Sequence, residues 1–202
     1  MIKIQGKIPR EIIVACSGGV DSMAVVDFLR RNHTVTAFYF NHGTKHGFEA
    51  ERFLKEYYSG SDVQLIARTI QDKKVPMGLS KEEYWRNERY KWLHSLAKEG
   101  QVITCHHLDD CVETWVWSSM HGSSSTIPYR NMNVIRPFRL NRKREFETWC
   151  HLNNVPYVED DSNKDLSYTR NYIRHAMMPH VLKVNPGIHK MLKKRIISEF
   201  TE

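Results

Sequence analysis

The sequence predicts an α/β fold: a Rossmann-like, doubly wound parallel sheet followed by a short helical C-terminal extension. Two observations lead to this prediction. Short apolar runs rich in β-branched residues alternate with longer stretches of helical periodicity, and the first run passes directly into a glycine-rich turn before a helix. Because parallel strands need long crossover connections, this alternation favours a parallel sheet with helices on both faces.

The expected elements follow in order along the chain. Strands are expected at residues 12–16, 35–40, 63–70 and 102–105, and helices at residues 21–31, 48–58, 81–98 and 109–120. After Pro128 the alternation loosens. There we expect a strand at 134–135, a helix near 142–153, a strand at 157–158 and two helices flanking the Asn185-Pro186-Gly187 turn.

The composition excludes several classes of protein. The chain has 202 residues, of which 41% are hydrophobic and 26% are charged, as in a globular protein with one sizeable domain. The longest apolar run is residues 12–16, so we expect no membrane span, no signal peptide and a cytoplasmic location. The four cysteines form no CxxC pair, which argues against a disulfide framework, a zinc knuckle and an iron-sulfur cluster.

Positive charge is concentrated near the C-terminus. The net charge is +7, and residues 170–195 contain seven Lys or Arg residues and no acidic residue. Such a segment is typical of nucleic-acid binding, although a solvated helix face would have a similar composition. The candidate contacts to a polyanion are Arg170, Arg174, Lys190, Lys193, Lys194 and Arg195.

The turn after the first strand has the features of an anion-binding loop. It reads Ser17-Gly18-Gly19-Val20-Asp21-Ser22 and leads into a helix. Two glycines let backbone amides close around an anion, and the N-terminus of the helix adds partial positive charge. The loop matches neither GxxxxGK[ST] nor GxGxxG. We expect it to bind phosphate, the alternative being a tight turn in which Asp21 only caps the helix.

A second polar cluster follows the strand at residues 102–105. His106 and His107 stand where that strand ends, the edge at which open α/β sheets bind ligands. The carboxylates of Asp109, Asp110 and Glu113 are expected on the first turns of the next helix, where they suit Mg²⁺ or an ammonium group. Helix capping alone would also place acids there. Either histidine could contact phosphate, position a nucleotide or act as a base.

The helix expected at residues 81–98 places Glu82, Arg86 and Arg89 on one face. One interpretation is an internal Glu–Arg ion pair on an exposed helix. The other is that both arginines point into the site, where guanidinium groups bind phosphate oxygens in pairs.

Taken together, these motifs resemble the tRNA(Ile)-lysidine synthetase family of PP-loop ATP pyrophosphatases from Glu11 to about Pro186. The matching stretches are SGGVDS at 17–22, FNHG at 40–43, EEYWRNERY at 82–90, TCHHLDDCVET at 104–114, RPF at 136–138 and EDDSNKDLSYTRNYIR at 159–174. The resemblance implies that ATP adenylates C2 of the wobble cytidine of a CAU anticodon in tRNA. Free lysine then displaces AMP to form lysidine, and AMP and pyrophosphate are released.

The resemblance also implies roles for individual residues. ATP would be bound by residues 17–22 together with Asn41 and His42, and Mg²⁺ by Asp21 and Asp110. The implied catalytic residues are Asp21, Arg86, Arg89, His106, His107, Asp109, Asp110 and Glu113. Residues 1–130 would form the nucleotide-binding core. Residues 131–202 would form the end of the catalytic domain and a basic RNA-contacting extension continuous with it.

The chain also departs from the family. Members generally carry further C-terminal domains that help to hold tRNA, so we expect a short form that lacks them, with a homodimer among the assemblies that the sequence allows. Two alternatives stay open: another PP-loop ATPase acting on RNA, such as a 2-thiolation enzyme or an amidotransferase-type synthetase, and a non-catalytic RNA-binding module. Thiolation members generally use paired cysteines, which this chain lacks.

Overall fold

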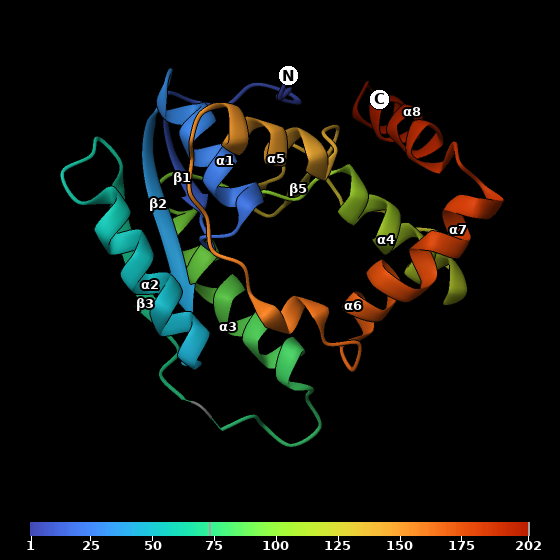
Figure 1. The fold of residues 1–202 in the computed structure, drawn as a ribbon, viewed down its shortest axis with the longest axis horizontal. Coiled ribbons are helices and arrows are strands. Elements are labelled where there is room, and N and C mark those ends of the chain that lie inside the picture. The colour runs from blue at the N-terminus through green and yellow to red at the C-terminus, as the bar shows by residue number, and fades with distance from the viewer. Residues whose placement is uncertain (73, 202) are drawn as a thin grey trace.

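A computed structural model of the chain describes residues 1–72 and 74–201 and shows a twisted sheet with helices on both faces (Figure 1). The sheet has six strands in the order β3-β2-β1-β4-β6-β5. All neighbouring pairs are parallel except β5 and β6. The strands are β1 (Glu11–Ala15), β2 (Thr34–Asn41), β3 (Gln64–Thr69), β4 (Gln101–Ile103), β5 (Arg130–Asn131) and β6 (Val134–Ile135).

Helices connect the strands and make up most of the C-terminal third. The helices between strands are α1 (Val20–Arg30), α2 (Lys45–Tyr58), α3 (Lys81–Leu96) and α4 (Leu108–Met120). After the sheet come α5 (Lys143–Leu152), the 3-10 turn η1 (Asp161–Lys164), α6 (Thr169–Tyr172), the π-helical turn η2 (Ile173–Met177), α7 (Met178–Val184) and α8 (Ile188–Thr201). The predicted doubly wound α/β class with a helical C-terminal end is confirmed.

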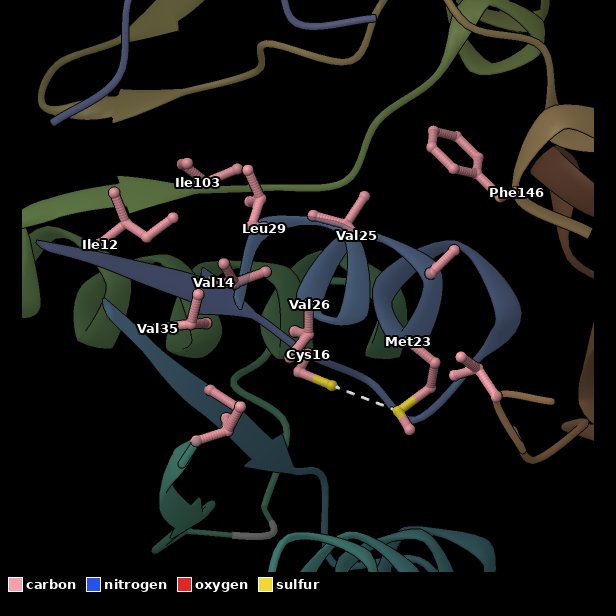
Figure 2. Close-up of a cluster of buried hydrophobic side chains, with 14 of the residues drawn as sticks. Ile12, Val14, Cys16, Met23, Val25, Val26, Leu29, Val35, Ile103 and Phe146 are labelled. Atoms are coloured by element: carbon pink, nitrogen blue, oxygen red, sulfur yellow. Dashed lines mark hydrogen bonds between the residues drawn. The ribbon is translucent and has the colours of Figure 1, made fainter. Parts of the chain in front are cut away.

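Alternation along the central strands divides the core into two layers. Val14 and its neighbours on one face pack with α1, α2 and α5, and Figure 2 shows this cluster with Leu29 and Phe146. On the opposite face, Phe38 and Phe40 pack against α3. Because residues two apart in a strand point to the same side, this alternation lets helices cover both faces.

The core also crosses the predicted boundary at residue 130. Ile135, Phe138, Phe146 and Cys150 belong to the same buried cluster as the residues of β1 and α1. Strand β6 pairs with β4, which joins the later segment directly to the sheet. The division into two parts stays a prediction, but the packing makes residues 134–155 part of the main core.

Several element predictions need correction. Helix α2 begins at Lys45 rather than near residue 48, because the Thr44 side chain accepts a hydrogen bond from Gly47 N and caps the helix early. The strand expected at 157–158 does not form. Instead Val158 N donates to the carbonyl of Gly18 at 2.9 Å, so this segment contacts a loop rather than a strand. The short antiparallel strand β5 and the π-helical turn were not predicted.

Within residues 1–72 and 74–201, no helix is both long enough and apolar enough to cross a lipid bilayer.

Substitution of Phe146 tests how α5 packs against the hydrophobic core. Its buried ring lies 6.2 Å from the ring of Phe138, centroid to centroid. Phe146→Ala should lower the free energy of unfolding by about 3–5 kcal/mol, because a buried cavity replaces the ring. Urea denaturation measures this value. The control Phe48→Ala removes a half-exposed ring and should change stability by no more than ~0.5 kcal/mol; similar losses in both variants would contradict the proposed packing.

Candidate active site

A cavity of about 660 Å³ opens at the carboxyl ends of the central strands. Its wall is formed by the loop after β1, the segments after β2 and β4, one face of α3, and the segment between α5 and η2. The volume lies in the range typical of small-molecule sites. The cavity occupies the position at which ligands bind in open α/β sheets, because the strand order reverses between β1 and β4.

The glycine loop (residues 17–22) forms one end of this cavity. Gly18 has φ +83°, a conformation that L side chains rarely adopt, and a Cβ atom there would lie 3.0 Å from Val158 Cγ2. Ser22 Oγ donates to Gly19 O at 2.9 Å and accepts from Ser17 N at 3.1 Å, which holds the loop closed. Helix α1 has no side-chain cap. Its first amides are therefore available to an anion in the cavity.

Asp21 lies at the start of α1 and lines the cavity. Its Oδ1 atom is buried without a hydrogen-bond partner, and its Oδ2 atom lies 3.7 Å from His107 Nε2. A buried carboxylate oxygen is costly unless it is paired. The structure therefore leaves one oxygen of Asp21 in need of a cation or a donor from a ligand.

His107 caps helix α4 instead of lining the cavity. Its Nδ1 accepts from Asp110 N at 3.2 Å, while Asp110 Oδ2 accepts from His107 N at 3.0 Å. A neutral ring that accepts at Nδ1 carries its proton on Nε2, the atom that faces Asp21. Burial lowers the pKa of His107, but the carboxylates of Asp110 and Asp21 outweigh burial and raise it. His107 thus links the start of α4 to the glycine loop.

Two arginines from the C-terminal segment pair with the acids of α4. Arg174 binds Glu113 at 2.8 and 2.9 Å and Asp110 Oδ1 at 3.1 Å, and Arg170 binds the same Asp110 oxygen at 2.7 Å. Burial would raise the pKa of Asp110, but His107 and Arg170 hold it well below its usual range. We call Asp110, Glu113, Arg170 and Arg174 the α4 charge cluster. Glu113 itself does not line the cavity.

Comparison with known proteins identifies the family of the chain. Residues 2–181 match the model of the PP-loop domain family. The chain belongs to this family.

Its curated relatives include proteins named tRNA(Ile)-lysidine synthase. The tRNA(Ile)-lysidine synthase of Thermosipho africanus is 34% identical over 190 residues, which are 87% of this chain and 44% of that protein. The enzyme of the same name from Francisella tularensis is 30% identical over 203 residues, covering 92% of this chain and 50% of that protein. The chain therefore spans about half the length of the curated relatives it matches.

A solved structure shares the fold. The NH3-dependent NAD synthetase of Campylobacter jejuni aligns with a TM-score of 0.52 and 16% identity, covering 96% of this chain and 86% of that one. At this identity the likeness shows the architecture alone.

Two predicted site residues of this PP-loop protein make structural contacts outside the cavity. Asp109 accepts from Arg142 Nε at 2.9 Å and Lys143 N at 2.8 Å and lies 3.1 Å from His189 Nε2, so it ties α4 to α5 and α8. Asn41 is fully buried and organises the turn before α2 by accepting from Gly43 N at 2.8 Å. Their chemical roles stay predictions, and neither lines the cavity.

His42 and His106 do line the cavity. Burial, with a smaller effect of Arg89, lowers the pKa of His42 to about 4. Burial lowers the pKa of His106 to about 3, and its Nδ1 lies 2.9 Å from the hydroxyl of Thr104. Both rings are therefore neutral near pH 7. Neutral rings suit hydrogen bonding and stacking better than charge neutralisation.

The two arginines of α3 lie in different environments. Arg89 lines the cavity, whereas Arg86 is exposed and does not. Among the residues that the structure describes, no carboxylate forms an ion pair with Arg89, and Glu82 does not pair with Arg86. Burial lowers the pKa of Arg89, and the nearby positive charge of Arg86 acts in the same direction. Arg89 is thus a cation that a bound anion would stabilise.

The basic residues of α8 also differ from one another. Lys193 Nζ donates to Leu140 O at 2.9 Å, and Arg195 pairs with Glu199 at 2.8 Å. Lys190 and Lys194 are exposed. RNA binding by this helix stays a prediction, and these two lysines are the best placed for it.

The residues that line the cavity fit a magnesium ion whose ligands come mainly from a polyphosphate. In the described part of the chain, no group of three or more His, Cys, Asp or Glu side chains converges as a metal site. Mg²⁺ bound to a nucleotide commonly takes only one or two carboxylates, with waters and phosphate oxygens as its other ligands. The unpaired oxygen of Asp21 suits that role. Both oxygens of Asp110 already accept hydrogen bonds, so its predicted metal role has less support.

Sequence reasoning missed the aromatic part of the wall. Trp85 of α3 stacks on His42, with ring centroids 4.9 Å apart and an interplanar angle of 25°. Tyr90 lines the cavity too, and its hydroxyl accepts from Arg136 at 3.1 Å. The spacing of Trp85 and Tyr90 on α3 gave a weak signal, since it places them near the face that bears Arg89.

The low pKa values of His42 and His106 predict that acid destabilises the fold. An unfolded histidine titrates near pH 6.5. The unfolded chain therefore binds more protons than the folded chain between about pH 6.5 and pH 4, and stability falls as the pH falls through this window. Urea denaturation should show a smaller loss in His42→Gln than in the wild type. An equal loss in both proteins would contradict the burial of His42.

Proposed function

We propose that the chain is an ATP-dependent RNA-modifying ligase of lysidine synthetase type. It would adenylate C2 of the wobble cytidine in a tRNA with a CAU anticodon and then join free lysine to that carbon. One observation carries the proposal: the uncapped N-terminus of α1 and the glycine loop face a cavity in which Asp21 has an unpaired oxygen. The relatives named tRNA(Ile)-lysidine synthase supply the class of RNA and the amino acid.

The reaction divides into two substitutions. First, the O2 atom of the cytosine attacks the α-phosphorus of ATP, the bond to the β-phosphate breaks, and pyrophosphate leaves. Second, the ε-amine of lysine attacks C2, the C2–O2 bond breaks, AMP leaves and the amine loses a proton. In both steps the negatively charged phosphate groups must be stabilised and held in position, so the protein contributes mainly electrostatic stabilisation and orientation.

The residues of the chain would share that task. The first amides of α1 hold the polyphosphate, and Asp21 holds the magnesium ion that screens its charge. Arg89 offers a positive charge on the cavity wall, and Arg170, whose side chain is 45% exposed, also lines the cavity. The low pKa of His106 makes it a weak base at neutral pH, so its part is to donate or accept a hydrogen bond.

Sulfur transfer has less support. Cys16 and Cys105 line the cavity, but burial raises the pKa of both thiols. A protonated thiol is a poor nucleophile. A non-catalytic RNA-binding module is also disfavoured, because the buried, unpartnered oxygen of Asp21 is costly unless a ligand uses it.

Asp21→Asn tests the central step. It keeps the shape of the side chain but removes the charge that a metal–phosphate complex needs. Pyrophosphate release in the presence of ATP, Mg²⁺, lysine and total tRNA should fall by about 10²-fold or more, the scale of losing one transition-state contact. The matched control Asp161→Asn changes an exposed acid paired with Lys164 and should leave turnover unchanged. Equal turnover in the Asp21 variant would sink the proposed role.

Lys190 and Lys194 test the RNA contact of α8. The Lys190→Glu/Lys194→Glu variant should bind a CAU-anticodon tRNA transcript more weakly. Its affinity should also depend less steeply on salt, by about one unit of log–log slope for each lost phosphate contact. Lys7→Glu/Lys98→Glu makes the same charge change at other exposed positions and is the control. An unchanged salt slope in the α8 variant would show that this helix does not contact RNA.

A further inference from the structure

Tyr90 lies among three guanidinium groups. It is a buried residue of α3 that lines the cavity. Arg136 Nη2 donates to Tyr90 Oη at 3.1 Å. The Cζ atoms of Arg86 and Arg89 lie 5.2 and 5.9 Å from the centre of the phenol ring. His94, on the same helix, is a further titratable neighbour, with 5.6 Å between the two ring centroids.

The surroundings of Arg136 favour a negative charge on Tyr90. Arg136 is only 2% exposed, its Nη1 donates to Pro128 O at 3.0 Å, and its Nε is buried without a partner. Within residues 1–72 and 74–201, no carboxylate forms an ion pair with Arg136. A buried charge is costly unless an opposite charge meets it. A phenolate at Tyr90 would supply that charge.

The same cations change the acidity of the phenol. Burial would raise the pKa of Tyr90, but Arg136, together with Arg86 and Arg89, outweighs burial and lowers it from its ordinary value. Tyr39 also lines the cavity, and there burial raises the pKa. The Tyr39 hydroxyl donates to a backbone carbonyl at 2.7 Å, a contact that favours the neutral phenol. Tyr90 is therefore the more easily ionised of the two.

The second step of the proposed reaction needs a base. Lysine carries an ε-ammonium group at neutral pH, and its nitrogen cannot attack C2 until it has lost a proton. An amine with an ordinary pKa of about 10.4 gives up that proton most readily to a base of similar strength. His42 and His106 are much weaker bases, because burial lowers their pKa values to about 4 and about 3. A phenolate is the closer match.

We propose that Tyr90 is a catalytic base, whose phenolate oxygen takes a proton from the ε-ammonium group of lysine before the amine attacks. The freed electron pair of the amine forms the N–C2 bond, and the C2–O2 bond breaks with its electron pair leaving on AMP. The nitrogen then loses its second proton to water, and Tyr90 returns its own proton to water. The proposal rests on the proposed function, because lysine and the adenylated cytidine are the substrates named there.

An ultraviolet titration tests the phenolate without any substrate. Tyrosinate absorbs at longer wavelength than tyrosine, so the titration follows ionisation of the nine tyrosines of the chain. In the wild type one group should ionise at lower pH than the rest, and Tyr90→Phe should lose that component. Tyr84→Phe is the control on the same helix. It removes a hydroxyl that donates to Asp72 O at 2.8 Å outside the cavity, and it should keep the component.

Kinetics separate the base from the adenylation step. In Tyr90→Phe, exchange of pyrophosphate into ATP with tRNA but without lysine should match the wild type, which also shows that the variant folds. Lysine incorporation at neutral pH should fall by about 10²-fold or more, the scale for loss of a general base. The deficit should shrink as the pH rises towards about 10.4, because more lysine then arrives as the neutral amine.

The contradicting results are equally specific. An identical ultraviolet titration in the wild type and Tyr90→Phe would overturn the proposal. So would full lysine incorporation in Tyr90→Phe, a deficit that does not change with pH, or equal losses in both steps, the last of which would mark a purely structural role. If the wild type showed the early tyrosinate but released no pyrophosphate from ATP with Mg²⁺ and tRNA, the proposed function would fail, and the base with it, while the ionised Tyr90 stood.

Discussion

The site depends on one backbone constraint: the chain must turn from β1 into α1 so that the amides of the first helical turn face open space. Gly18 makes this turn with a positive φ that disfavours other residues, and Val158 lies where a side chain at Gly18 would stand. The hydroxyl of Ser22 closes the loop from inside, so it serves the loop conformation rather than offering a free donor. The glycine loop is thus shaped before any ligand arrives, which lowers the entropic cost of binding.

Contacts that are distant in sequence hold the rest of the site against this loop. Val158 binds the Gly18 carbonyl through its amide, His107 faces Asp21 through Nε2, and Arg174 joins the C-terminal segment to α4. Asp110, the acid of the α4 capping box, also accepts hydrogen bonds from Arg170 and Arg174. On the cavity wall, Asp21 keeps one buried oxygen without a hydrogen-bond partner, and Arg89 has no carboxylate partner among the residues that the structure describes. The Arg89 guanidinium would meet an anionic ligand, and the free oxygen of Asp21 would meet its cation.

The features that depend on short stretches of sequence were predictable. The strand–glycine–helix turn and the polar strand end at His106 follow from short patterns, and the α/β class follows from periodicity. The sequence could not predict which residues each carboxylate contacts. Asp109 and Glu113 are four residues apart, yet Asp109 contacts α5 and α8 while Glu113 contacts Arg174. The Trp85–His42 stack joins two elements that the chain sequence does not relate. Residues 157–158 have strand-like residue types, but the amide of Val158 donates to the Gly18 carbonyl in the glycine loop instead of pairing with a strand.

The most direct measurement of the central claim is the affinity of the protein for ATP in the presence of Mg²⁺ after Gly18→Ala, compared with Gly60→Ala. Both glycines have a positive φ, +83° and +74°, but a Cβ atom at Gly60 would meet nothing within 4 Å. Both variants therefore carry similar backbone strain, and only the first disturbs the glycine loop. The account predicts that Gly18→Ala loses ATP affinity by about tenfold or more while Gly60→Ala binds like the wild type; equal affinities in the two variants would contradict it.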